Sequence, residues 1–85
     1  MLQVTIREHV VYDGRRKENV KFDQYQILLG QRLVGYLGKD PKCRPVLVIK
    51  GLPEDAIAAI NQAAVEKLGP EAGPAVESQL EKADE

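Results

Sequence analysis

Two side chains in this sequence are of types that commonly do chemistry, one histidine and one cysteine. His9 stands in an alternating stretch next to Glu8, which falls on the opposite strand face, and no partner for catalysis can be placed. Cys43 lies between Lys42 and Arg44, and flanking cations favour the reactive thiolate. Nothing places an activating histidine beside it, and a single cysteine excludes an internal disulfide and a thiolate-based zinc site. We therefore predict no catalytic residue, no cofactor and no metal site.

The glycine and carboxylate patterns point the same way. Gly30 and Gly35 have the four-residue gap of a phosphate-binding loop, but Tyr36 occupies the position of the required lysine, and the segment is a predicted strand. The carboxylates that could act in acid–base pairs show no defensible pairing; they are Asp13, Asp23, Asp40, Glu54 and Asp55. The sequence therefore predicts a protein that is not an enzyme.

Basic side chains are the second candidate functional group. Residues 1–52 carry ten Lys or Arg against five Asp or Glu, whereas residues 53–85 carry two against eight. One interpretation is that opposite charges favour docking of the two halves and keep the surface soluble; the alternative is a basic sheet face that binds an anionic partner. The residues expected to contact nucleic acid, if it binds, are Arg15, Arg16, Lys17 and Arg32.

Three strands followed by an alanine-rich helix give residues 20–66 a layout that resembles the integrase-type DNA-binding domains, with Tyr36, Leu37 and Gly38 echoing their pattern. The resemblance implies a sheet that reads nucleic acid. The tryptophans of that family are absent, and Asp13 and Asp23 dilute the basic face. We use the resemblance as an analogy and assign no family from it.

The element around which we expect the rest to pack is a hairpin at residues 25–38. Gly30 is placed as the first residue of a two-residue turn, which requires a positive φ. A regular register would pair Ile27 with Val34 and Tyr25 with Tyr36. It would also gather Leu28, Leu33 and Leu37 on the opposite face, where one helix cannot cover them. These three leucines are the predicted partner interface.

The remaining elements follow from periodicity. Residues 2–12 alternate as a half-buried strand, and a loop of three or five residues is expected around residues 14–17. Val20 and Phe22 point to one face of the second strand, whereas Tyr25, Ile27 and Leu29 have the opposite parity. A bulge between Asp23 and Gln24 is expected to absorb the one residue needed to bring them onto the same face. Residues 46–49 predict a short buried strand, and residues 53–68 predict a helix that presents Ile57, Ile60, Ala64 and Leu68.

Together these features predict an α+β fold in which a four-stranded, mostly antiparallel sheet carries one helix on one face. We expect a single domain at residues 1–69 and a flexible, disordered acidic tail at residues 70–85. No apolar run reaches the ~20 residues that span a bilayer, so no membrane partner is expected. The preferred function is a small non-catalytic, cytoplasmic protein-interaction module that forms a homodimer or binds another protein, with nucleic-acid binding as the alternative.

Overall fold

The structure is a computed structural model that describes residues 3–77. Its sheet contains β1 (Val4–Asp13), β2 (Glu18–Leu29), β3 (Arg32–Gly38), β4 (Val46–Leu47) and β5 (Val76–Glu77), in that spatial order, and α1 (Glu54–Leu68) is the helix. The first four strands pair antiparallel, and β5 pairs parallel with β4. The predicted α+β class is confirmed, with a fifth strand added to the predicted four.

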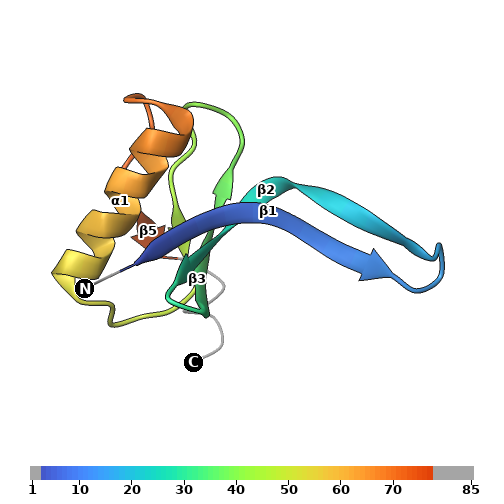
Figure 1. The fold of residues 1–85 in the computed structure, drawn as a ribbon. Helices are drawn as coiled ribbons and strands as arrows, with labels where there is room; N and C mark the ends of the chain where they lie inside the picture. The colour runs from blue at the N-terminus through green and yellow to red at the C-terminus, as the bar shows by residue number, and fades with distance from the viewer. Residues whose placement is uncertain (1–2, 78–85) are drawn as a thin grey trace.

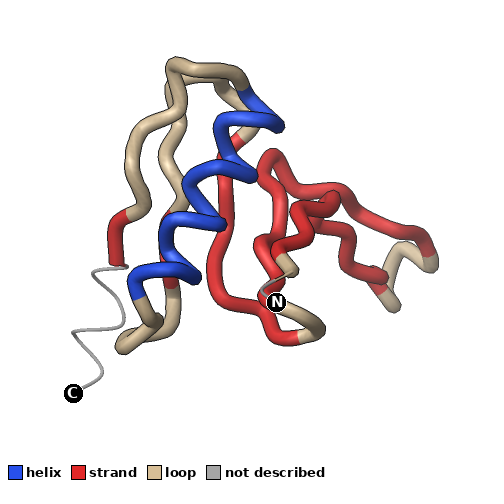
Figure 2. Tube along the Cα trace, turned by 60° about the vertical axis from the view of Figure 1, so that its left-hand side comes forward, coloured by secondary structure: helices blue, strands red, loops and turns tan. Residues whose placement is uncertain are grey.

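The helix covers one side of the sheet, here called the inner face (Figures 1 and 2). Its buried residues are Ala56, Ile60 and Ala64, whose spacing forms one stripe along the helix. They meet Ile27, Val34, Leu37 and Leu47 in the core cluster. The small alanine side chains allow the helix to approach the strands closely.

The β2–β3 hairpin departs from the predicted register. Leu29 opposes Arg32 and Leu28 opposes Leu33 as expected, but Ile27 opposes Gly35. Val34 is the extra residue, and the predicted pairs Ile27–Val34 and Tyr25–Tyr36 are wrong. The bulge turns both Val34 and Leu37 into the core, where neither side chain is exposed, and a regular alternation would have left one of them on the other face.

Gly35 allows the neighbouring strand β4 to pass close by. A Cβ atom at this position would lie 2.5 Å from the carbonyl oxygen of Val46. The carbonyl oxygen of Val34 accepts a hydrogen bond from the amide of Val48, 2.9 Å away. The β3–β4 contact therefore requires a residue without a side chain at position 35.

The first hairpin extends well beyond the helix (Figure 1). A 15-residue helix is about 22 Å long, whereas the 12 residues of β2 span about 40 Å. We call the projecting part, residues 9–22, the arm. At its root the register shifts between Glu8 and Val10, where residues 22–24 of β2 stand opposite His9 alone. The irregularity lies where the sequence predicted a bulge, but it adds two residues rather than one, so Phe22 and Tyr25 stay on opposite faces.

The loop at the end of the arm has four residues, 14–17, because Asp13 opposes Glu18. The prediction of three or five residues is therefore wrong. That prediction assumed that Val20 and Phe22 must avoid the polar face, but Val20 opposes Val11, and Phe22 contacts His9 on the face away from the helix. Because the arm lies beyond α1, the helix shields neither of its faces. An apolar side chain of the arm therefore loses little by pointing to one face rather than the other.

Residues 70–77 return along the helix to the sheet. The amide of Ala75 donates to Oδ1 of Asn61 (2.8 Å), and the amide of Val76 donates to the carbonyl oxygen of Pro45 (2.9 Å). Ala72 and Ala75 pack against the core cluster. This segment of the tail expected to be disordered therefore forms part of the fold, and the rest of that tail, residues 78–85, lies outside the described residues.

Candidate interaction surface

The three leucines predicted as a partner interface do not form one. Leu37 is fully buried in the core, Leu28 is 7% exposed, and Leu33 is half-buried. The bulge at Val34 is the cause, because it rotates Leu37 away from the face that carries Leu28 and Leu33. The chain already shelters two of the three side chains, and the proposed surface at Leu28, Leu33 and Leu37 is corrected accordingly.

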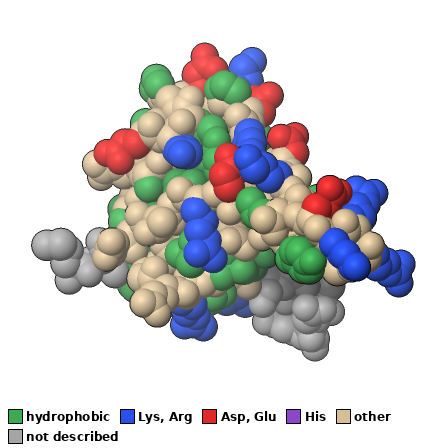
Figure 3. All heavy atoms as spheres, turned by 45° about the vertical axis from the view of Figure 1, so that its right-hand side comes forward, with side chains coloured by type: hydrophobic (Ala, Val, Ile, Leu, Met, Phe, Trp, Pro, Cys, Tyr) green, Lys and Arg blue, Asp and Glu red, His purple; other side chains and the backbone are tan. Residues whose placement is uncertain are grey.

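The exposed apolar surface lies on the arm instead. Among residues 3–77, the large hydrophobic side chains that are exposed are Val10 (41%), Val11 (45%), Tyr12 (61%), Phe22 (42%) and Val65 (39%). All except Val65 belong to the arm. Apolar side chains on both faces of a two-stranded ribbon have no covering layer, and a space-filling view shows hydrophobic and basic side chains together on the projecting part (Figure 3).

The sequence contained a signal for this surface that we did not use. Val10, Val11 and Tyr12 are three consecutive apolar residues in an otherwise alternating strand, so they place apolar groups on both faces. The predicted helix was also too short to reach them. Length matching between helix and strands would therefore have identified the arm.

His9 holds the base of the arm on the outer face, the side of the sheet away from α1. Its ring lies 4.4 Å from the ring of Phe22 and 5.3 Å from that of Tyr36, centroid to centroid. Nε2 of Gln24 lies 3.1 Å from Nδ1 of His9 and donates to it. These contacts pack the His9 ring between β2 and β3 on the outer face.

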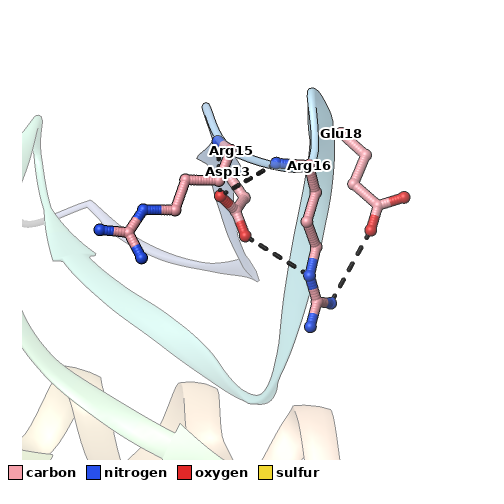
Figure 4. Close-up of polar contacts among 4 residues, drawn as sticks. All are labelled: Asp13, Arg15, Arg16 and Glu18. Atoms are coloured by element: carbon pink, nitrogen blue, oxygen red, sulfur yellow. Dashed lines mark hydrogen bonds and ion pairs between the residues drawn. The ribbon is translucent and has the colours of Figure 1, made fainter.

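The tip of the arm is closed by one carboxylate. Oδ1 of Asp13 accepts hydrogen bonds from the backbone amides of Arg15 (2.9 Å) and Arg16 (3.4 Å). The Arg16 guanidinium lies between Asp13 and Glu18, at 3.7 and 3.8 Å, whereas the Arg15 side chain extends away from both (Figure 4). Lys17 has a positive φ of 57°, which turns the chain back into β2. Beside this turn, a hollow of about 450 Å³ is lined by Val11, Tyr12, Val20 and Phe22 among others.

The four basic residues predicted to contact nucleic acid are not brought together. Arg15, Arg16 and Lys17 form the arm tip, but Arg32 follows the Gly30–Gln31 turn at the other end of β2. About 40 Å of strand separates the two groups. In addition, Arg16 is held by two carboxylates of its own hairpin.

An ion pair ties the inner side of the arm's root to the body. Nζ of Lys39 donates to Oε2 of Glu8 across 2.7 Å, and the ammonium groups of Lys39 and Lys67 lie 5.2 and 5.0 Å from the centroid of the Tyr25 ring. The hydrogen bond from Lys39 lowers the pKa of Glu8 and raises that of Lys39. The cluster thus brings together Glu8 of β1, Tyr25 of β2, Lys39 directly after β3 and Lys67 of α1.

Replacing Glu8→Gln should therefore lower stability in a pH-dependent manner. A lowered pKa in the folded state means that Glu8 stabilises the fold above its ordinary value of 4.5, and that this contribution is lost as the pH falls through the folded-state pKa. The raised pKa of Lys39 means that its contribution persists below 10.5 and is lost at higher pH. Urea unfolding at a series of pH values should show a constant difference between the proteins near neutrality that disappears in acid. A difference that grows in acid would contradict this assignment.

Cys43 packs partly against the core cluster, where its side chain is half-buried. Within residues 3–77, no three His, Cys, Asp or Glu side chains lie close enough to hold a metal ion. In the same part of the chain, no helix has the length and apolar character needed to cross a membrane.

No protein-family model, curated protein or solved structure matches this chain. The arm and its surroundings therefore stand as the candidate functional site on their geometry alone.

Proposed function

We propose that this chain is a non-catalytic interaction module that self-associates through the β1–β2 arm. The observation that supports this most directly is the concentration of exposed Val10, Val11, Tyr12 and Phe22 on a projecting two-stranded ribbon. Isolated two-stranded ribbons are marginally stable in water, and exposed apolar side chains gathered on one part of a small protein favour a contact site. Burial of the arm against another surface would stabilise the two-stranded ribbon and would remove its apolar side chains from water.

Charge favours a second copy as that surface. The arm tip presents Arg15 and Lys17, while α1 carries Glu54, Asp55 and Glu66. A chain with a basic projection and an acidic helix is complementary to itself, and a two-fold dimer uses each complementary contact twice. Association of two copies is the simplest arrangement that gives both the basic arm tip and the acidic helix an oppositely charged partner.

The test is a charge substitution on the arm, Val10→Lys. Sedimentation velocity of the unmodified chain should show a concentration-dependent monomer–dimer equilibrium. The substitution should weaken it at least about tenfold, which corresponds to about 1.4 kcal/mol, because a lysine removes buried apolar area and adds a charge to the contact.

The matched control is Val65→Lys on α1. Val65 is 39% exposed and Val10 is 41% exposed, so the two substitutions change composition and exposure equally at different places. Val65→Lys should leave the dissociation constant within about twofold of the unmodified chain, less than ~0.5 kcal/mol. A chain that remains monomeric up to about 100 μM, where contacts of 5 kcal/mol would already be visible, overturns self-association.

Nucleic-acid binding is the second candidate, and one observation favours it. Arg15, Arg16 and Lys17 are consecutive basic residues at the end of a projection, where they can approach a phosphate backbone. Such binding would weaken steeply with salt and would be lost in Arg15→Ala/Lys17→Ala but retained in Arg32→Ala. Absence of any salt-sensitive gel shift with mixed DNA and RNA at low salt rules it out.

A further inference from the structure

The outer edge of β1 is the longest open strand edge in the described part of the sheet. β1 lies at one end of the strand order with ten residues, whereas β5 at the other end has two. Proteins usually protect such edges with proline, lysine or short strands. The segment Val4–Asp13 contains no proline, no glycine and no lysine. Its unpaired amides and carbonyls are therefore a template for another strand.

We propose that this edge pairs antiparallel with β1 of a second copy, with Val10 on the two-fold axis. The proposal rests on self-association through the arm and specifies its geometry. It would join two five-stranded sheets into one continuous sheet. The exposed Val10 of each chain would lie directly opposite the other.

Symmetry restricts the possible registers. Two identical edges can pair antiparallel only about an axis perpendicular to the sheet, so both helices lie on the same side of the joined sheet. Opposed residues share a face, and their numbers must therefore have the same parity. Each register is then defined by its centre, the residue on the two-fold axis that lies opposite the same residue of the second chain.

Charge distinguishes among these registers. Centres at Arg7 or Glu8 place like charges directly opposite, which is destabilising. A centre at Val10 pairs seven residues of each strand and places Arg7 opposite Asp13 of the other copy, twice by symmetry. It also brings Val10 against Val10 and His9 against Val11. A centre at His9 pairs nine residues of each strand, but it places Arg7 opposite Val11 and Asp13 opposite Thr5, so neither charge meets an opposite one. A centre at Val11 pairs only five residues of each strand.

The same register places each arm tip beside a groove of the other copy. Beyond Asp13, the basic tip would run past Val4 and Ile6 of the second chain. These two residues, with Ala63, Glu66 and Lys67, line a hollow of about 240 Å³ between the open edge and α1. The carboxylate of Glu66 is available there to the cationic tip. The edge, the charge pattern and the groove thus favour the same arrangement.

Disulfide trapping tests the register. In a Cys43→Ser background, Val10→Cys should form an intermolecular disulfide, because opposed residues of paired strands are about 4.5–5.5 Å apart between Cα atoms, within the range a disulfide spans. We expect crosslinking at least about tenfold faster than for Val65→Cys, whose thiols meet by diffusion. Non-reducing gels sampled over time after addition of oxidised glutathione give the rates, and thermal unfolding verifies that each variant is folded.

Val11→Cys is the neighbouring control. In the proposed register Val11 lies opposite His9 of the other copy, so its thiols should crosslink more slowly than those of Val10→Cys. Faster crosslinking of Val11→Cys, or equal rates for all three variants in a chain that sedimentation shows to be dimeric, overturns the strand pairing and leaves self-association standing. A monomeric chain overturns both.

Discussion

Replacing Leu37→Ala should unfold the protein far more readily while leaving the arm surface intact. The Leu37 side chain is fully buried among Ile27, Val34 and Ile60. Truncating such a residue costs about 2–5 kcal/mol through lost burial and the cavity left behind. For a domain of this size that is a large share of a total stability of about 5–15 kcal/mol. Urea unfolding followed by far-UV circular dichroism measures the loss directly.

The matched control is Leu33→Ala on the same strand. Leu33 is half-buried on the outer face, so its truncation should cost only about 1 kcal/mol of transfer free energy. The pair also separates the two interpretations of these leucines. If Leu37 were an interface residue, Leu37→Ala would weaken self-association and leave the unfolding free energy of the monomer nearly unchanged.

Replacing Gly35→Ala should have the second large effect, because it is the substitution with the least room. The new Cβ atom would meet the Val46 carbonyl oxygen at 2.5 Å and the Val46 carbonyl carbon at 3.2 Å. Both are backbone atoms and cannot rotate away, so β4 must move off β3. We expect a loss of about 2–3 kcal/mol, at the upper end for overpacking. The midpoint of thermal unfolding should fall by roughly 10–20 °C in a domain this small.

Gly14→Ala provides the comparison. Nothing lies within 4 Å of a Cβ atom at Gly14, and its φ is outside the left-handed region. The substitution should change the unfolding free energy by less than about 0.5 kcal/mol, as expected of an exposed site without special geometry. If both variants lost the same unfolding free energy, the close approach of β3 and β4 would not be the cause of the loss in Gly35→Ala.

The fold class and the order of the elements could be predicted from the sequence wherever one face of an element had to be apolar. The helix at Glu54–Leu68 followed from periodicity, because only one of its faces could meet the core. The predicted change of strand parity in β2 does not occur, because Phe22 lies on the outer face of an arm that α1 does not cover. The bulge at Val34 could not be derived in this way. Both parities of β3 carry apolar residues, and the position of α1 decides which of them is buried.

The surface was harder to predict than the fold for the same reason. Leu28, Leu33 and Leu37 look like surplus apolar groups only if the hairpin register is regular. The two-residue strand β5 has no period to detect, and it depends on contacts with Asn61 and Pro45, which are distant in sequence. Features that depend on packing between segments distant in sequence leave no local pattern to detect.

The order β1-β2-β3-β4-β5 repeats the order of the chain, so each strand completes its pairing with one that has already been synthesised. Low sequence separation between contacts favours rapid folding, since little loop entropy is lost before a contact forms. The contacts of α1 with β1 and the pairing of β5 with β4 must close over long stretches of chain. Until the helix arrives, the nascent meander exposes its inner face, and the interval before that closure is when the chain is most vulnerable to aggregation.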